Sequence, residues 1–234
     1  MRIVPITVAA CFVLAALPAL RAETGAGKSW MDHYSENPRQ TDFVTGVLAL
    51  NRDGYFASEN QRFVAIGFLT QVFKQNPGEV NEWLQTAVPI LSDQGRRTLL
   101  ASAWLARNPA SYKYLHDLHT VSSGDQRDAA EHMMGQESIP AVADIPVTSV
   151  HAMDLQWGAF LASGDERYIE NVFAAFGSDR PGLATQARYT LVQNAAANPK
   201  VLQICRDVLA RQPDSVRAEF QAALNEATTT KPGV

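Results

Sequence analysis

The chain is poor in cysteine. Its 234 residues include two, Cys11 and Cys205, and Cys11 lies in an apolar N-terminal run. If that run is removed during export, Cys205 is left without a partner and no intramolecular disulfide can form. The mature chain must then obtain its stability from a hydrophobic core, and about 210 residues are enough to build one.

Strand patterns are missing as well. No stretch longer than three residues carries a strand signal, whereas apolar residues recur at three- and four-residue spacing along most of the chain. This spacing predicts about ten helices and an all-α fold. We expect antiparallel helical hairpins stacked as an α-α superhelix or as an irregular, solenoid-like bundle.

An excess of basic charge is also absent. The formal net charge is −4, which is a poor match for nucleic acid or for an anionic membrane surface. Residues 1–22 have a positive start at Arg2, an apolar stretch and small residues before a cleavage site, which is typical of a secretory signal peptide. Cleavage after Ala22 leaves 18 basic against 24 acidic residues. A retained membrane anchor is the alternative. We predict a periplasmic or secreted bacterial protein without stable membrane insertion.

The remaining chain divides by composition. Residues 23–36 are polar and indicate a linker or a short first helix, and we assign them to a linker. Residues 37–227 are predicted to form a single all-α domain of helical hairpins. Residues 135–147 hold two prolines and no periodicity, which indicates a long loop or subdomain boundary. Residues 228–234 read as a flexible tail.

The dipeptide Asn-Pro recurs between the apolar stretches, at residues 37–38, 76–77, 108–109 and 198–199. Asn is a favoured helix N-cap, and Pro is well tolerated as the first helical residue because it lacks an N–H that would have no partner there. Each Asn-Pro is therefore predicted to end one helix and begin the next. The separations of 32 residues and of 90, about three times 30, suit a helix-turn-helix repeat.

One stretch resembles the tetratricopeptide repeat family. Residues 157–165, Trp-Gly-Ala-Phe-Leu-Ala-Ser-Gly-Asp, place an aromatic four residues before a Gly-Asp turn, and an apolar helix with Ile169, Phe173 and Phe176 follows. The family's Leu-Gly pair and its small alanine are missing, so the resemblance covers one hairpin, about residues 150–177. It implies a protein that binds a peptide or another protein.

Catalytic motifs are absent from the sequence. There is no G-x-S-x-G, no H-E-x-x-H and no complete phosphate loop, since the stretch Gly25 to Ser29 lacks the first glycine and a preceding strand. His116 and His119 would share a helical face, and with His132 they could form a zinc site. A solvent-facing polar surface is the simpler interpretation of these histidines.

Asp154 lies at the edge of an apolar stripe. A carboxylate there could have a raised pKa and act as an acid or base. It could instead anchor a neighbouring helix N-terminus or an arginine such as Arg167 or Arg188. Cys205 falls on the inner face of its helix and is predicted to be inert core.

The tryptophans divide into two kinds. Three of them lie on apolar stripes and are expected to pack in the core, namely Trp83, Trp104 and Trp157. The residues around Trp30 do not explain its burial. We assign no catalytic, metal or cofactor-binding residue from the sequence, and the binding residues stay undefined.

The sequence thus favours an exported, non-enzymatic binding or scaffolding protein with a peptide or protein partner in the cell envelope. This rests on the analogy between helical arrays and binding surfaces. A helical hydrolase that uses Asp154 or the histidines, and a carrier of a small apolar ligand, are the alternatives.

Overall fold

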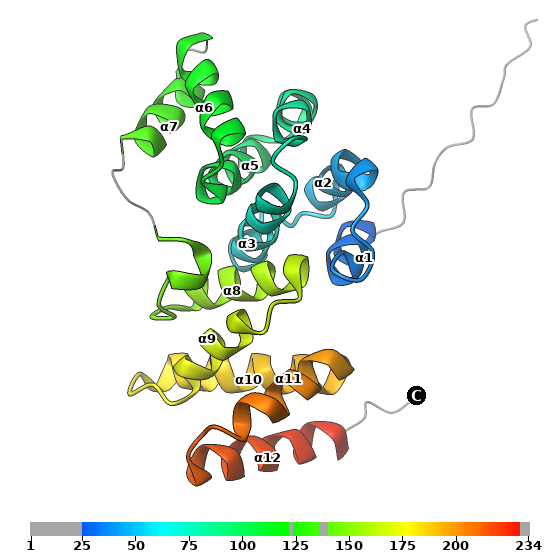
Figure 1. Ribbon diagram of the computed structural model, residues 1–234, viewed down its shortest axis with the longest axis vertical. Coiled ribbons are helices and arrows are strands. Elements are labelled where there is room, and N and C mark those ends of the chain that lie inside the picture. Colours follow the sequence, from blue (N-terminus) through cyan, green and yellow to red (C-terminus); the bar gives the residue numbers. More distant parts are fainter. Residues whose placement is uncertain (1–24, 122–123, 136–139, 230–234) are drawn as a thin grey trace, which may run out of the picture.

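The computed structural model describes residues 25–121, 124–135 and 140–229, and this part of the chain consists of helices joined by short connections (Figure 1). It contains twelve α-helices and three short 3-10 helices, with no strand among the described residues. The prediction of an all-α fold is confirmed. The predicted signal peptide, residues 1–22, lies outside the described residues. Among those described, no helix combines the length and apolarity needed to span a membrane.

The helices follow one another closely along the chain. The first six α-helices are α1 (Ala26–His33), α2 (Phe43–Arg52), α3 (Glu59–Gln75), α4 (Val80–Ala87), α5 (Asp93–Ala106) and α6 (Pro109–Val121). The other six are α7 (Asp125–Met134), α8 (Val150–Ser163), α9 (Arg167–Phe176), α10 (Pro181–Ala197), α11 (Pro199–Leu209) and α12 (Asp214–Thr229). The 3-10 helices are η1 (Gln40–Asp42), η2 (Val88–Ile90) and η3 (Val142–Asp144).

Two of the four Asn-Pro pairs begin a helix as predicted. The Asn108 side-chain oxygen accepts a hydrogen bond from the Ser111 amide at 2.8 Å, and α6 starts at Pro109. The Asn198 oxygen accepts from the Lys200 amide at 2.9 Å, and α11 starts at Pro199. In both cases the cap satisfies an amide of the first turn that has no partner within the helix.

The other two pairs do not begin helices, and the prediction is wrong there. The Asn76 amide group donates to the Val72 carbonyl at 2.8 Å and to the Tyr34 hydroxyl at 3.3 Å, so it closes the end of α3. After Pro77 the chain makes a turn before α4 begins at Val80. Asn37 and Pro38 lie in the connection that precedes η1. Tertiary contacts of the Asn side chain decide which role the dipeptide takes.

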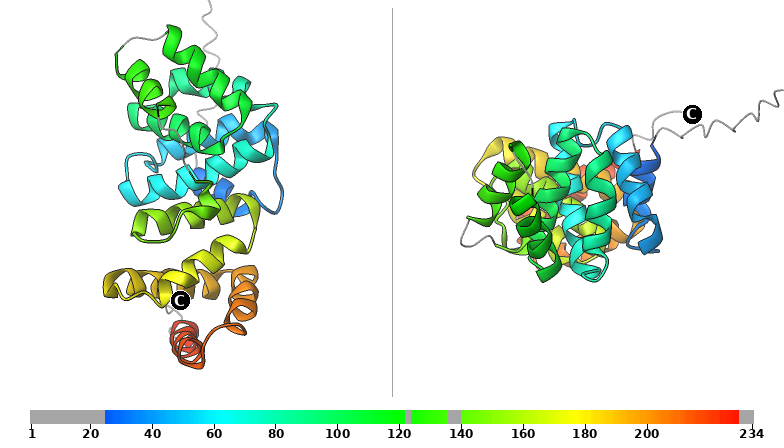
Figure 2. Two further views of the ribbon diagram at one scale, coloured as in Figure 1. Left: turned by 60° about the vertical axis from the view of Figure 1, so that its left-hand side comes forward. Right: turned by 90° about the horizontal axis from the view of Figure 1, so that it is seen from above.

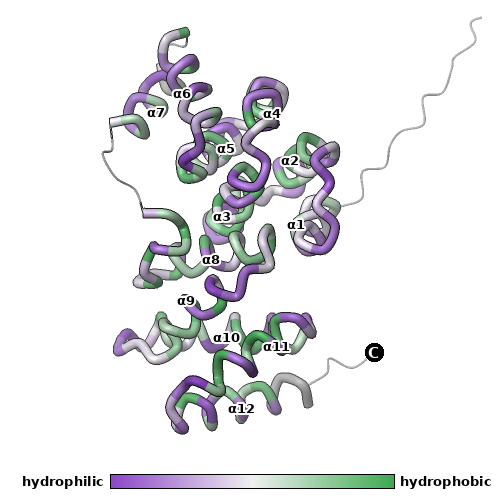
Figure 3. The backbone as a smooth tube through the Cα atoms, viewed as in Figure 1, coloured by the Kyte–Doolittle hydropathy of each residue, from purple (hydrophilic) through white to green (hydrophobic). Residues whose placement is uncertain are grey.

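The helices stack along the long axis of the molecule (Figures 1 and 2). α6 and α7 lie at one end, and α11 and α12 lie at the other. Hydrophobic and hydrophilic residues alternate along the helices (Figure 3), as expected where each helix buries one side. The buried apolar side chains form two clusters. The N-terminal cluster runs from Met31 to Leu115 and includes Ala162, and the C-terminal cluster extends from Ile66 to Leu224.

The most extensive helix-helix contact joins α3 and α8. These helices are separated by four others in the sequence, so the chain leaves α3, builds α4 to α7, and returns to α3 with α8. An array of hairpins in series would give its largest contacts between neighbours in the sequence. Elsewhere in the molecule, helices that are consecutive in the sequence do pack on each other, for example α6 with α7, α8 with α9, and α9 with α10.

Residues 26–33 form a helix, not the predicted linker. α1 packs on α2 and on α8, and Met31 and Tyr34 are buried in the N-terminal cluster. At the other end, α12 continues to Thr229, so the first two residues of the predicted tail are helical. The rest of that tail lies outside the described residues.

The segment predicted as a long loop, residues 135–147, is described at residue 135 and from residue 140 onwards. Its carbonyl groups are held by α8 and α9. The Gln156 amide group donates to the carbonyls of Val142 at 2.7 Å and Ile145 at 3.0 Å, and the Asn171 amide group donates to that of Ala143 at 2.8 Å. This part of the predicted loop is therefore fixed to the helical array.

Candidate functional site

The three histidines considered as zinc ligands lie on α6 and α7, which pack against each other. His119 lies 3.7 Å from the Glu131 carboxylate, and His116 lies 3.9 Å from its neighbour Asp117. Among the described residues, no group of three or more histidine, cysteine or acidic side chains is placed to hold a metal ion. The helices thus place these side chains among the polar groups of the α6–α7 surface without forming a coordination site.

The Gly25–Ser29 stretch has a structural explanation. The amides of Gly25 and Gly27 donate to one carboxylate oxygen of Asp53, at 3.2 and 3.0 Å. Gly27 also lies against the backbone of Leu50, where a side chain would collide. Gly27 thus allows α1 to pack on α2, and the amides of both glycines already have a carboxylate as acceptor.

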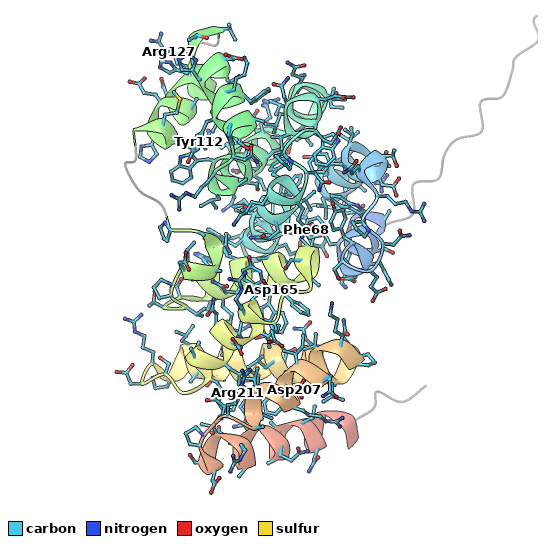
Figure 4. All side chains as sticks on the ribbon, in the orientation of Figure 1. Phe68, Tyr112, Arg127, Asp165, Asp207 and Arg211 are labelled. Carbon is cyan, nitrogen blue, oxygen red and sulfur yellow. The ribbon has the colours of Figure 1, made fainter. Side chains whose placement is uncertain are left out.

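Trp30 belongs to an aromatic cluster that the sequence did not predict. Its ring makes edge-to-face contacts with Tyr34, Phe43 and Phe68, at centroid distances of 5.8, 6.1 and 4.9 Å. Phe68 lies on α3, toward α1 (Figure 4). Gly46 provides the space, because a Cβ at this position would overlap the indole ring. A glycine in the middle of an apolar helix was the available sequence signal for this contact.

The other three tryptophans pack on the core as predicted. Trp83 stacks on Phe43 at 4.1 Å between ring centroids, and Trp157 is 6% exposed. Trp104 is partly buried and contacts both apolar clusters. The predicted burial of Cys205 is also confirmed, and burial raises the pKa of its thiol to about 12. A thiol of this kind stays protonated and unreactive in the folded protein.

Asp154 is the most unusual polar residue in the described part of the chain. It lies on α8, its side chain is buried, and its Oδ2 atom has no hydrogen-bond partner. The predicted arginine partners are engaged elsewhere. Arg167 pairs with Asp165 at 2.7 Å, and Arg188 pairs with Glu219 at 2.9 Å. The prediction that Asp154 anchors one of these arginines is wrong.

Burial is the only cause that shifts the titration of Asp154, and it raises the pKa of the carboxyl group to about 7. Desolvation disfavours the charged form, and no opposite charge offsets it. The same burial keeps Oδ2 away from solvent, so a substrate would need a local opening of the helices to reach it. The geometry makes Asp154 a candidate proton-binding group rather than an accessible catalytic one.

Asp154 lies beside a close crossing of α3 and α8. Gly67 on α3 lies against the carbonyl group of Leu155, and Gly158 on α8 lies against the carbonyl group of Val64. Neither position has room for a Cβ atom. The backbones of the two helices are therefore in direct contact at two points of α8. One is Leu155, the residue after Asp154, and the other is Gly158, one turn further along the helix.

No protein-family model, curated protein or solved structure matches this chain. The resemblance of residues 150–177 to a tetratricopeptide hairpin thus stays a prediction. Locally, α8 ends at Gly164 with a left-handed backbone of φ 66°, and α9 packs back on α8.

Proposed function

We propose that this chain is an exported, non-enzymatic binding or scaffolding protein whose helical surface holds a peptide or protein partner. The observation that carries the proposal is the stacking of helices along the long axis of the molecule (Figure 2). Such stacks offer an extended surface to a partner, with several helices contributing side by side.

The exposed face of α10 is the first candidate contact surface. Thr185, Tyr189, Gln193 and Ala196 recur at three- and four-residue spacing, and all are exposed and uncharged. Tyr189 is 60% exposed. Tyrosine provides a large, rigid contact area with a polar end, and it is enriched in the energetically important part of protein interfaces.

Tyr112 on α6 is a second candidate contact. It is 42% exposed and points outward from α6, on the side away from α4 (Figure 4). Tyr114, two residues further along the helix, instead packs inward and donates a hydrogen bond to the Leu84 carbonyl at 3.4 Å. The two tyrosines of this turn thus differ in environment, and Tyr112 is the one available to a partner.

The alternative of an acid/base hydrolase draws on one observation, the pKa of Asp154 near 7. General acids and bases work best when their pKa lies near the working pH. The burial of the same carboxyl group opposes this alternative, so binding is the function that we put forward.

The test is an affinity capture of the tagged chain, residues 23–234, from a cross-linked bacterial envelope, followed by mass spectrometry. We expect one stoichiometric protein partner. Tyr189→Ala and Tyr112→Ala serve as controls for each other, since a partner on the α10 face should be lost only from the first variant.

Capture of no specific partner, together with hydrolytic activity of the purified chain, would contradict the proposal. Retention of the partner by both single variants and by the double variant would show that neither tyrosine belongs to the contact surface.

A further inference from the structure

The junction of α3 and α8 holds the two apolar clusters together. Phe68 on α3 belongs to the N-terminal cluster and Ile66 on the same helix to the C-terminal one. In the same way, α8 contributes Ala162 to the N-terminal cluster and Met153 to the C-terminal one. A change in how these two helices pack would therefore alter the relation between the two halves of the core.

Asp154 lies at this junction without the groups that normally stabilise a buried carboxylate. It is the fifth residue of α8, beyond the first turn, where amides without helical partners could bind it. The cap of that turn is Ser149, whose hydroxyl accepts from the Ala152 amide at 3.2 Å. One turn beyond Asp154, the indole Nε1 of Trp157 is also buried without a partner.

No charged side chain on the packed elements affects the titration of Asp154, since burial is its only cause. The elements that pack against α8 are α3, α9, α1, η3 and α10. The titratable and charged side chains of these elements are Glu59, Arg62 and Lys74 on α3, Arg167, Tyr168 and Glu170 on α9, Lys28, Asp32 and His33 on α1, Asp144 on η3, and Arg188 and Tyr189 on α10. On α8 itself, the other such residue is His151. Among the described residues, an ionised Asp154 therefore has no counter-charge when the helices are closed.

His151 is a second titratable group at the same junction. It precedes Asp154 by one turn, its ring stacks on Phe63 of α3 at a centroid distance of 4.1 Å, and its Nε2 atom lies 3.5 Å from the Glu59 carboxylate. These two contacts place the turn of α8 that precedes Asp154 against the N-terminal part of α3.

We infer that the α3–α8 junction is a pH-sensitive joint, in which the neutral Asp154 carboxyl keeps the two helices closed and its ionised form favours their separation. Separation would let water reach Oδ2, the carboxylate oxygen that the closed junction leaves buried without a partner. Between about pH 4 and pH 7 the closed form binds more protons than the open form. The stability of the closed form relative to the open form therefore falls as the pH rises through this range. The inference is independent of the proposed partner binding.

The experiment is hydrogen-deuterium exchange of residues 23–234 between pH 5 and pH 8, with rates corrected for the intrinsic pH dependence of amide exchange. In the wild-type chain we expect the protection of peptides from α3 and α8 to fall roughly tenfold or more over this interval. A tenfold fall corresponds to a difference of about one unit between the pKa of Asp154 in the closed form and in the open form. Peptides from α11 are the internal reference and should change less.

Asp154→Asn should abolish this fall, because the amide stays neutral at every pH and has a nearly identical shape. Asp165→Asn is the matched control on a partly exposed carboxylate that is paired with Arg167, and it should retain the fall. His151→Gln should retain most of it. The inference is wrong if protection in the wild-type chain is independent of pH, or if the fall persists in Asp154→Asn or disappears only in His151→Gln.

A second measurement does not depend on the variants. Titration of the aspartate side-chain carbons by NMR in the folded wild-type chain should show Asp154 ionising above pH 6. A midpoint near pH 4 would overturn the inference.

Discussion

The carbonyl group of Leu155 lies directly against the Cα atom of Gly67, and no side chain could be placed between them. The same relationship holds in reverse between Gly158 and the carbonyl group of Val64. Through these two glycines, the backbones of α3 and α8 come into direct contact.

Gly67→Ala and Gly158→Ala should each lower the free energy of unfolding by about 3 kcal/mol, since the added methyl group forces two backbones apart. Gly182→Ala is the control, because Gly182 lies in α10 with nothing within 4 Å of the new methyl group. This change should be neutral or stabilise by up to about 1 kcal/mol through helix propensity. Urea denaturation measures all three, and equal effects would contradict the close crossing.

Asp154→Asn should stabilise the protein at neutral pH. Because the pKa of Asp154 in the folded chain, about 7, exceeds its unfolded value, the stability that Asp154 contributes to the wild-type chain falls as the pH rises from about 4 to about 7. The full shift corresponds to about 4 kcal/mol, which residual hydration reduces to about 2 kcal/mol. The difference between variant and wild type should be near zero at pH 4 and constant above pH 7, as measured by urea denaturation across this range.

Asp165→Asn should behave in the opposite way. The hydrogen bond from Arg167 lowers the pKa of Asp165, so its contribution to stability is present at neutral pH and is lost as the solution becomes acidic. Because this pair is exposed, we expect the variant to lose less than about 1 kcal/mol at pH 7. A stabilising effect of this variant at pH 7 would contradict the ion pair.

Asn108→Ala should cost about 1–2 kcal/mol. The change removes the cap of α6 and also a hydrogen bond of 3.3 Å to the Phe73 carbonyl, in a buried position. Asn37→Ala changes the same dipeptide where the structure shows no helix start, and should alter stability by less than about 0.5 kcal/mol. Thermal unfolding of the two variants compares a capping Asn-Pro with a non-capping one.

Cys205 should resist thiol reagents in the folded protein. Its thiol is buried and its pKa is raised to about 12, so almost none of it is ionised at pH 8. In residues 23–234 it is the single cysteine, so absorbance from a disulfide reagent reports on it directly. We expect no reaction without denaturant and stoichiometric reaction with it, whereas rapid labelling of the native chain would place the thiol at the surface.

Properties of the helices that depend on nearby residues could be predicted from the sequence. Cys205 could be placed on the buried side of its helix because four apolar neighbours follow a helical period. Asn108 and Asn198 could be recognised as caps because a cap involves groups only two or three residues apart. Asn76 shows the limit, since its contact with Tyr34, 42 residues earlier, belongs to the tertiary structure.

The candidate site shows the same division. The sequence suggested that Asp154 could have a raised pKa, because it lies at the edge of an apolar stripe. It also suggested a partner in Arg167 or Arg188, and the structure gives both arginines to other carboxylates. Which charges surround a buried group depends on how distant helices dock, and periodicity does not contain this information.

The sequence by itself therefore determined the all-α character of the chain, most of its helices and the inward faces of those helices, because hydrophobic periodicity and capping act over a few residues. The tertiary structure alone decided that α1 is part of the core around Trp30, that α3 pairs with α8, and that no described residue supplies a counter-charge to Asp154. The pairing joins residues about ninety positions apart, and it depends on backbone contact at two glycines that local patterns cannot match to each other.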